Sequence, residues 1–299
     1  MRVKFHQIAM LALGLGALLG ACGTATTSTA HRSTTPGSTQ QRPSEIIPVS
    51  SGALAMGPLQ SNGTIAVLAG TEHSKGVFLY DIADHQEIGS FSVSNLAQSI
   101  TQLPNGDIAI GFGGGSVGAV QLYAESGREL ASVPVAEPVL SLSVGSNGGS
   151  VLVLEGTSRA RAVALLDVAT RQASSTIPVA LQTVAIASSL QTPNELYGLG
   201  SQGIVAVYTT TTGQEIGDFT VGHSGRALAM GPGGNHLFVL KGSAQIRNVA
   251  VVDLATERDV RVLPAPKGAV AIQTDLTSQH LIELASLPNA ANIQVASTS

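Results

Sequence analysis

Short runs of apolar residues, separated by turns rich in Asn and Gly, recur from about residue 45 to the end of the chain. Some runs alternate apolar and polar residues, as in 87–93 and 129–135, and others are continuously apolar, as in 151–154 and 237–240. Alternation over four to eight residues is typical of half-buried strands, and Asn and Gly tolerate the positive φ of tight hairpin turns. The pattern predicts an all-β domain of many short strands.

Two duplicated segments indicate that these strands come in repeating units. The segment Ala53–Pro58 recurs 174 positions later as Ala227–Pro232, and Gln86–Gly89 recurs 128 positions later as Gln214–Gly217. The first offset equals four units and the second three units of about 43 residues, and a repeat of about 40–45 residues is the size of a four-stranded propeller blade. We therefore expect a β-propeller.

The number of units sets the number of blades. Five complete units run from Gly52 to about Ala265, and a sixth opens at Gly268 with only three strands. The segment Glu45–Val49 matches a fourth strand such as Ser175–Val179, so we expect it to complete the last blade and leave no terminal edge unpaired. Six blades are expected, with seven as the alternative. In the competing interpretation, residues 45–49 belong to a tether.

The N-terminus is typical of an exported protein. Arg2 and Lys4 precede an apolar stretch, Ile8–Leu19, that is too short for a stable membrane span. The segment Leu19–Cys22 (LGAC) looks like a lipobox, the motif at which a signal peptide is cut before a cysteine that receives acyl chains such as palmitate. Cys22 is the only cysteine, and lipidation explains it better than a chance cysteine after an ordinary signal.

The predicted domain organisation follows from this export signal and its lipobox. Residues 1–21 are a lipoprotein signal peptide, residues 22–44 are the lipidated cysteine and a tether, and residues 45–299 are the propeller. The tether is rich in Thr, Ser, Gln and Pro, a composition that cannot bury enough surface to offset its ordering entropy. We expect a cell-membrane protein, anchored by lipid, whose domain faces the extracytoplasmic side. Whether the membrane is the inner or the outer one stays open.

Composition excludes one class of partner. Charged residues make up 11% of the chain and the formal net charge is −4, whereas nucleic-acid binding needs clustered Lys and Arg. The single cysteine excludes a disulfide within the chain, so the packing of the strands must stabilise the domain. Nothing in the sequence indicates a cofactor.

The third and fourth strands of the units carry a family resemblance. Residues 163–170 run on to Ile177-Pro178-Val179, and residues 249–256 have the same form, a valine-rich strand that ends in Asp. These segments resemble the YVTN-type repeats of lactonase-like β-propellers. The resemblance implies a propeller, commonly of seven blades, and suggests lactone hydrolysis. The aromatic residue usual in the family's second strand is mostly aliphatic here. Propellers of the WD40, kelch and quinoprotein types generally use Trp, which this chain lacks.

Three aspartates at the ends of third strands allow two interpretations. Asp81, Asp167 and Asp253 could bind a metal, or each could accept hydrogen bonds from the backbone amides of the turn that follows. Ala124 and Thr209 hold the equivalent positions in the second and fourth units, which a shared metal site would not permit. We therefore expect structural turns and predict no metal site.

The candidate site residues lie in the loops that join second to third strands and one blade to the next. His223 and Arg226, in a glycine-flanked segment, are the foremost pair, and the other candidates are His73, Arg159, Arg161 and Arg247. The plainer interpretation is that they are solvated loop charges. Serines abound, but no Gly-x-Ser-x-Gly elbow or other catalytic set stands out, so no catalytic residue is assigned.

These observations favour a non-catalytic binding module, with the lipid anchor for the membrane and a protein, glycan or small molecule as the ligand. The alternatives are an extracytoplasmic lactonase-like hydrolase and a structural or assembly role in the cell envelope.

Overall fold

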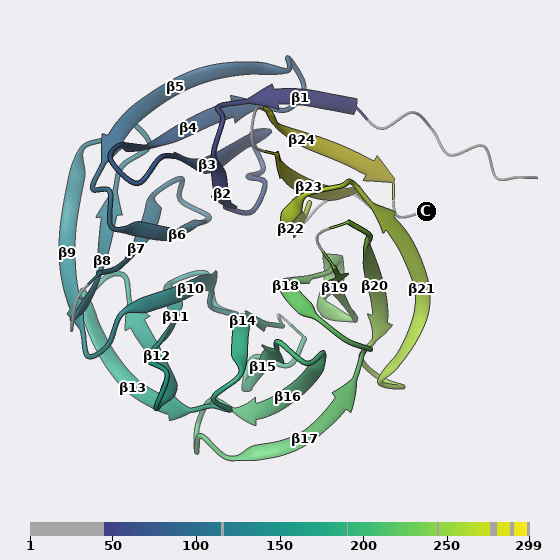
Figure 1. The fold of residues 1–299 in the computed structure, drawn as a ribbon. Helices are drawn as coiled ribbons and strands as arrows, with labels where there is room; N and C mark the ends of the chain where they lie inside the picture. Colours follow the sequence, from purple (N-terminus) through teal and green to yellow (C-terminus); the bar gives the residue numbers. More distant parts are fainter. Residues whose placement is uncertain are drawn as a thin grey trace, which may run out of the picture. The chain divides into compact units, whose positions relative to one another are not determined.

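Six four-stranded antiparallel sheets form a ring in the computed structural model, which describes residues 45–114, 117–189, 191–243, 245–275, 280–287 and 290–297 (Figure 1). This is a six-bladed β-propeller, as the repeat predicts. The only helical segment in the described part is the short 3-10 turn η1 (Pro232–Gly234). That part contains no helix with the length and apolar character needed to cross a membrane.

The strands of each blade are given in order from the inner strand, nearest the centre of the ring, to the outer strand. Blade 1 contains β2 (Ala53–Met56), β3 (Thr64–Gly70), β4 (Lys75–Asp81) and β5 (Gln86–Val93), and blade 2 contains β6 (Ala97–Gln102), β7 (Ile108–Gly113), β8 (Gly118–Tyr123) and β9 (Glu129–Val135). Blade 3 contains β10 (Val139–Val144), β11 (Ser150–Gly156), β12 (Arg161–Asp167) and β13 (Gln172–Pro178). Blade 4 contains β14 (Thr183–Ser188), β15 (Glu195–Gly200), β16 (Ile204–Thr209) and β17 (Glu215–Thr220), and blade 5 contains β18 (Gly225–Met230), β19 (His236–Gly242), β20 (Arg247–Asp253) and β21 (Arg258–Ala265).

Blade 6 joins the two ends of the ring. Its inner strands are β22 (Ala269–Thr274), β23 (His280–Leu287) and β24 (Ala290–Ser297), and its outer strand is β1 (Glu45–Val49). Strand β1 pairs with β24 over five residue pairs, with Ile47 opposite Ile293, and both of these side chains are buried. The prediction that the N-terminal strand closes the last blade is confirmed, and residues 45–49 are not part of a tether.

Apolar clusters between adjacent blades hold the ring together. Each of the six interfaces has its own cluster. In β11, Val151 and Val153 face blade 2, while Leu152 and Leu154 face blade 4. Because both faces of a second strand are covered, its sequence is continuously apolar rather than alternating.

The repeating unit is a pair of blades rather than one blade. The inner strands of the odd blades begin at Ala53, Val139 and Gly225, each 86 positions after the one before. The inner strands of the even blades begin at Ala97, Thr183 and Ala269, again 86 positions apart. The period of about 43 residues is therefore the average of two blade types, and the domain is three blade pairs arranged in a ring.

The odd blades share the aspartate turn that the sequence predicts. The Oδ1 atom of Asp81 accepts a hydrogen bond from the amide of Ala83 at 2.8 Å. Asp167 and Asp253 each accept one from the amide of the threonine three residues ahead, at 2.7 and 2.8 Å. The bonds from these threonines lower the pKa of both carboxyls. The structural interpretation of the three aspartates is confirmed.

Candidate ligand-binding cavity

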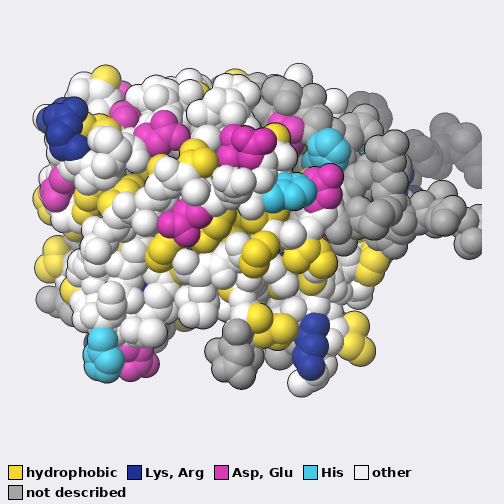
Figure 2. All heavy atoms as spheres, turned by 90° about the horizontal axis from the view of Figure 1, so that it is seen from above, with side chains coloured by type: hydrophobic (Ala, Val, Ile, Leu, Met, Phe, Trp, Pro, Cys, Tyr) yellow, Lys and Arg dark blue, Asp and Glu magenta, His cyan; other side chains and the backbone are white. Residues whose placement is uncertain are grey.

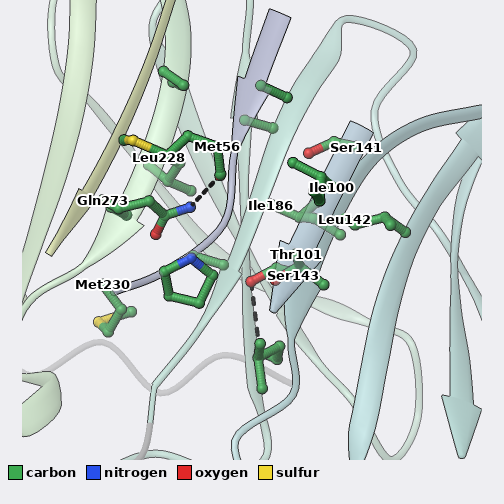
Figure 3. A pocket seen from close by; sticks show the side chains of 18 of the residues that line it. Met56, Ile100, Thr101, Ser141, Leu142, Ser143, Ile186, Leu228, Met230 and Gln273 are labelled. Atoms are coloured by element: carbon green, nitrogen blue, oxygen red, sulfur yellow. Dashed lines mark hydrogen bonds between the residues drawn. The ribbon is translucent and has the colours of Figure 1, made fainter. Parts of the chain in front are cut away.

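The six inner strands β2, β6, β10, β14, β18 and β22 surround the centre of the ring (Figure 1). They enclose a cavity of about 530 Å³ (Figure 3). This volume lies in the range of pockets that hold small molecules. Every inner strand contributes to the wall, so the cavity is a product of the whole ring rather than of one blade. Figure 3 shows side chains from several strands converging on it.

A β-bulge at the same place in every inner strand shapes one mouth of the cavity. In each strand the register with the second strand shifts around the second residue. A bulge leaves one residue outside the ladder and re-aims its side chain. The six bulge residues all line the cavity, and they are Leu54, Gln98, Leu140, Val184, Arg226 and Val270.

A ring of large apolar side chains from the inter-blade clusters borders the middle of the cavity, which we call its waist. Two residues after each bulge the inner strand has a buried aliphatic side chain or Met, and all six line the cavity. They are Met56, Ile100, Leu142, Ile186, Leu228 and Ile272, and Figure 3 labels the first five. The middle of the cavity therefore suits an apolar group.

The segment after β2 narrows the other mouth. Pro58, Leu59 and Gln60 line the cavity. Leu59 forms an isolated bridge with Asp275 of blade 6, and Gln60 donates a hydrogen bond to the carbonyl of Gln102 in blade 2. This segment thus connects the blades on either side of its own.

Hydrogen bonds between blades make the narrow end rigid. Side chains donate to inner-strand carbonyls of the neighbouring blade. Gln273 donates to Met56 at 3.3 Å (Figure 3). Ser188 donates to Val144 at 3.0 Å, and Thr274 donates to Met230 at 2.5 Å. Each bond satisfies a carbonyl at a strand end, where the sheet ladder stops. The cavity wall is therefore preformed.

The two faces of the ring differ in charge. The basic face contains the connections from second to third strands and from blade to blade, and its charged residues are Lys75, Arg159, Arg161, Arg226, Lys241, Arg247 and Lys267, with Glu72, Glu137 and the buried Glu155. The acidic face contains the other connections, and its charged residues are Asp81, Asp84, Asp107, Glu125, Asp167, Glu195, Asp253, Glu257 and Asp275, with Arg128, Arg171 and Arg258. The bulge residues lie at the basic face, and the narrow mouth opens on the acidic face.

Exposed apolar side chains follow the same division. Large ones occur at the basic face and on the outer strands, and in the described residues none lies in a connection of the acidic face. Those at the basic face are Leu54, Leu96, Val117, Leu181, Ile204, Ile246 and Leu287. In the side view of Figure 2, acidic side chains gather toward one edge of the wall and hydrophobic ones toward the other.

The structure brings all six candidate residues of the folded domain to the basic face, but only Arg226 lines the cavity. His73, Arg159 and His223 are exposed in connecting loops. The guanidinium of Arg161 donates to the carbonyl of Thr183 in the next blade, which is a structural contact. Arg226 belongs to strand β18 and not to a loop. Cys22, with the rest of residues 1–44, lies outside the described residues.

Arg226 and Arg247 are two candidates whose charges interact. Arg247 begins β20, and its Nε donates to the carbonyl of Ser243 at 3.2 Å. Burial, with the nearby charge of Arg226, lowers the pKa of Arg247. No carboxylate of the described residues forms an ion pair with either guanidinium, whereas the neighbouring Lys241 pairs with Asp259 at 3.0 Å.

The polar side of the cavity wall, on blade 2, is absent from the sequence predictions. Strand β6 contributes Gln98, Ser99, Thr101 and Gln102. The hydroxyl of Ser99 and both polar atoms of the Gln102 side chain are buried and lack a hydrogen-bond partner in the described part of the chain. An alignment of the even blades at their 86-residue spacing would have shown that β6 is more polar than β14 and β22.

Two buried carboxyls lie outside the cavity. Glu155 accepts a hydrogen bond from the amide of Glu137 at 3.2 Å, and burial raises its pKa. Glu283, in β23, is 2% exposed, and burial raises its pKa to about 8. Its Oε1 atom has no hydrogen-bond partner in the described residues.

The described residues include no cluster of three or more His, Cys, Asp or Glu that could hold a metal.

Comparison with known proteins supports the fold alone. The chain is similar to one in the solved structure of Kuenenia stuttgartiensis hydrazine synthase, with a TM-score of 0.65 and 14% identity over 83% of this chain and 84% of that one. No family model matches the sequence, and no curated protein matches it. The YVTN and lactonase resemblance thus has no support from a family match.

Proposed function

We propose that the protein is a binding module of the bacterial cell envelope, anchored through acyl chains on Cys22, that holds a ligand in the central cavity. The preformed cavity, with its apolar waist, carries this proposal. Its lining residues include no Asp, Glu, His or Cys, so the Ser and Thr hydroxyls of the wall have no general base in the cavity to activate them.

The way in which the chain enters the ring fits such an anchor. Glu45 begins β1. Its Oε2 atom lies 3.3 Å from Nε2 of His85, which belongs to a connection of the acidic face. A tether attached at this point would leave the wider mouth, on the basic face, turned away from the anchor. A ligand or partner could then approach without obstruction by the tether.

The lactonase-like hydrolase is the weaker alternative. It would need a general base beside the bound lactone, and the candidate His223 is exposed in its loop rather than in the cavity wall. We therefore expect no hydrolysis of a simple lactone, and turnover that His223→Ala abolishes would favour the enzyme instead.

The cavity can be tested with N-phenyl-1-naphthylamine, a neutral apolar dye whose fluorescence rises on leaving water. We expect the domain to bind it, and Ala271→Phe, which fills the cavity from its wall, to abolish binding. Ala160→Phe adds the same side chain on an exposed loop of the basic face and serves as the control. Equal dye binding by all three proteins would refute the cavity as the site.

The anchor is tested separately. Replacing Cys22 with Ser should release the protein from the membrane fraction of cells or leave it uncleaved, because the acceptor thiol for the acyl chains is gone. Unchanged membrane retention and normal processing of C22S would contradict the proposed anchor.

A further inference from the structure

The charge distribution of the cavity narrows the class of ligand. Of all the residues that line it, Arg226 alone is charged, and it lies at the wider mouth. The other five bulge residues around that mouth are four aliphatic side chains and Gln98. The amide of Gln98 donates to the carbonyl of Gly113, so part of its hydrogen-bonding capacity is already used. A single basic group therefore faces the entrance of an otherwise neutral, largely apolar cavity.

A second guanidinium reinforces this basic group. Residue Gly225 pairs with Lys241, and Gly242 pairs with Arg247, so Arg226 and Arg247 come from neighbouring positions of one sheet. The charge of Arg226 adds to the effect of burial in lowering the pKa of Arg247, which indicates repulsion between the two guanidiniums. Lys241 is not a free third cation, because Asp259 and the carbonyl of Val221 accept its hydrogen bonds.

The repeat shows that no structural rule demands an arginine at this position. Leu54 and Leu140 hold the same position in the other two odd blades, 172 and 86 positions earlier. Arg226 is exposed, and its side chain forms no hydrogen bond or ion pair with the described residues, in contrast to Arg161, which donates to the next blade. A guanidinium offers paired donors that match the oxygens of carboxylate, sulfate or phosphate groups.

We infer that the ligand is an amphipathic anion, whose apolar body occupies the waist of the cavity and whose anionic head group binds Arg226 and Arg247 at the mouth. This inference rests on the proposed function, because it assigns a chemical class to the ligand of the same cavity. An anion between the two guanidiniums replaces their repulsion with two charge-assisted hydrogen bonds. A cationic head group would meet repulsion there, and a neutral one would leave both charges uncompensated.

The test compares two dyes with one aromatic skeleton. The first is N-phenyl-1-naphthylamine, which is neutral, and the second is 8-anilino-1-naphthalenesulfonate, which adds a sulfonate. We expect the sulfonate dye to bind the unaltered domain about tenfold more tightly than the neutral dye, because its head group gains charge-assisted hydrogen bonds that solvent weakens at the exposed mouth. Ala271→Phe should abolish binding of both dyes.

Arg226→Gln is the decisive variant because Gln98 already occupies the same position in blade 2, so the fold accepts this side chain. It should remove the tenfold preference and leave the affinity for the neutral dye unchanged. Arg159→Gln makes the same change of net charge on an exposed loop of the same face and should keep the preference.

Two results would overturn the inference. One is equal binding of both dyes by the unaltered domain, which would leave the proposed cavity intact while removing the anionic head group. The other is an equal loss of preference in the Arg226 and Arg159 variants, which would assign it to the general charge of the face. Loss of neutral-dye binding is a different failure, and it would refute the proposed function itself.

The source of the anion can be distinguished with decanoate and with vesicles. Displacement of the sulfonate dye by decanoate but not by decanol would support a free amphiphile as the ligand. Sedimentation of the domain with phosphatidylglycerol vesicles, absent with phosphatidylcholine and lost in Arg226→Gln, would instead assign the head group to a membrane lipid. Displacement by decanol as effective as that by decanoate would count against any anionic head group.

Discussion

Blade 3 and blade 6 have the same strand order but are assembled from different parts of the chain. In blade 3 the strands β10 to β13 follow one another, whereas blade 6 takes β1 from the N-terminus and β22 to β24 from the C-terminus. Their outer strands each bury one isoleucine, Ile177 in blade 3 and Ile47 in blade 6. The closing strand therefore reproduces the packing of an ordinary blade.

The second strands of the two blades differ in chemical character at one buried position in the middle of the strand. Leu142 pairs with Val153 in blade 3, and the equivalent pair in blade 6 is Ile272 with Glu283. Blades 1, 2 and 5 also have an aliphatic residue here, namely Val67, Ile110 and Val239. The ring is thus closed by a blade that replaces a buried aliphatic side chain with a carboxyl, which should make the stability of that blade depend on pH at this position.

The largest expected effect comes from Glu283→Val. Raising a carboxyl pKa from 4.5 to about 8 corresponds to about 5 kcal/mol, at about 1.36 kcal/mol per pKa unit. Because the folded state holds the proton more tightly, the wild-type free energy of unfolding should fall as pH rises from about 4.5 to 8. The variant should therefore gain up to about 5 kcal/mol at pH 8.5 from removal of the buried charge, and much less at pH 5.

Urea denaturation at the two pH values measures this gain. The reciprocal variant Val153→Glu should transfer the same pH dependence to blade 3, where the site has equivalent pairing partners. A gain for Glu283→Val of the same size at both pH values would show that packing, and not ionisation, distinguishes the blades.

The next effect tests whether the closing strand contributes as much as an internal one. Ile47→Ala and Ile177→Ala each remove a buried side chain from an outer strand, and each should lower the free energy of unfolding by about 2–5 kcal/mol. Thermal and urea unfolding of the two variants give the values. If Ile47→Ala costs under about 1 kcal/mol while Ile177→Ala costs several, β1 is an accessory and the comparison fails.

A smaller effect concerns the connections that leave the two blades. The hydroxyl of Tyr80 accepts a hydrogen bond from the amide of Ser50, just after β1, and that of Tyr208 accepts one from the amide of Ala180, just after β13, both at 3.1 Å. Tyr80→Phe and Tyr208→Phe should each cost about 1 kcal/mol, because an amide loses its partner. Hydrogen exchange of the Ser50 and Ala180 amides should increase in the matching variant only, and faster exchange at both sites in either variant would argue for global loosening.

The smallest effect is expected at the ion pair between Glu45 and His85, which connects blade 6 to blade 1. Both side chains are exposed, and such pairs contribute about 0–1 kcal/mol. Glu45→Gln should therefore change the free energy of unfolding by no more than this amount at pH 6. A loss above about 2 kcal/mol would mean that ring closure depends on the ion pair and not on the apolar packing of β1.

The fold was predictable because its determinants are local and repeated. Short apolar runs, Asn-Gly turns and two duplicated segments are enough to derive four-stranded units, and the match of residues 45–49 to a fourth strand gives the closure. The aspartate turns followed in the same way, since each depends on only three or four consecutive residues.

The cavity was less predictable because its lining depends on register. The sequence indicates the basic face and names Arg226, but it places that residue in a loop, whereas the bulge in β18 puts it on the wall. The polar wall of β6 and the bridging segment after β2 depend on which strands meet across the ring, and no single unit shows this. The buried state of Glu283 likewise depends on the apolar neighbours of two blades.

The pairing of β1 with β24 has a mechanical consequence. Strand β1 runs away from its point of entry at Glu45, and all five of its residue pairs lie side by side along β24. A pull on the preceding chain along the strand axis therefore loads these pairs together, in shear, and does not unzip them one at a time. Tension on the protein would act on the same hydrogen-bonded strand that completes the circle.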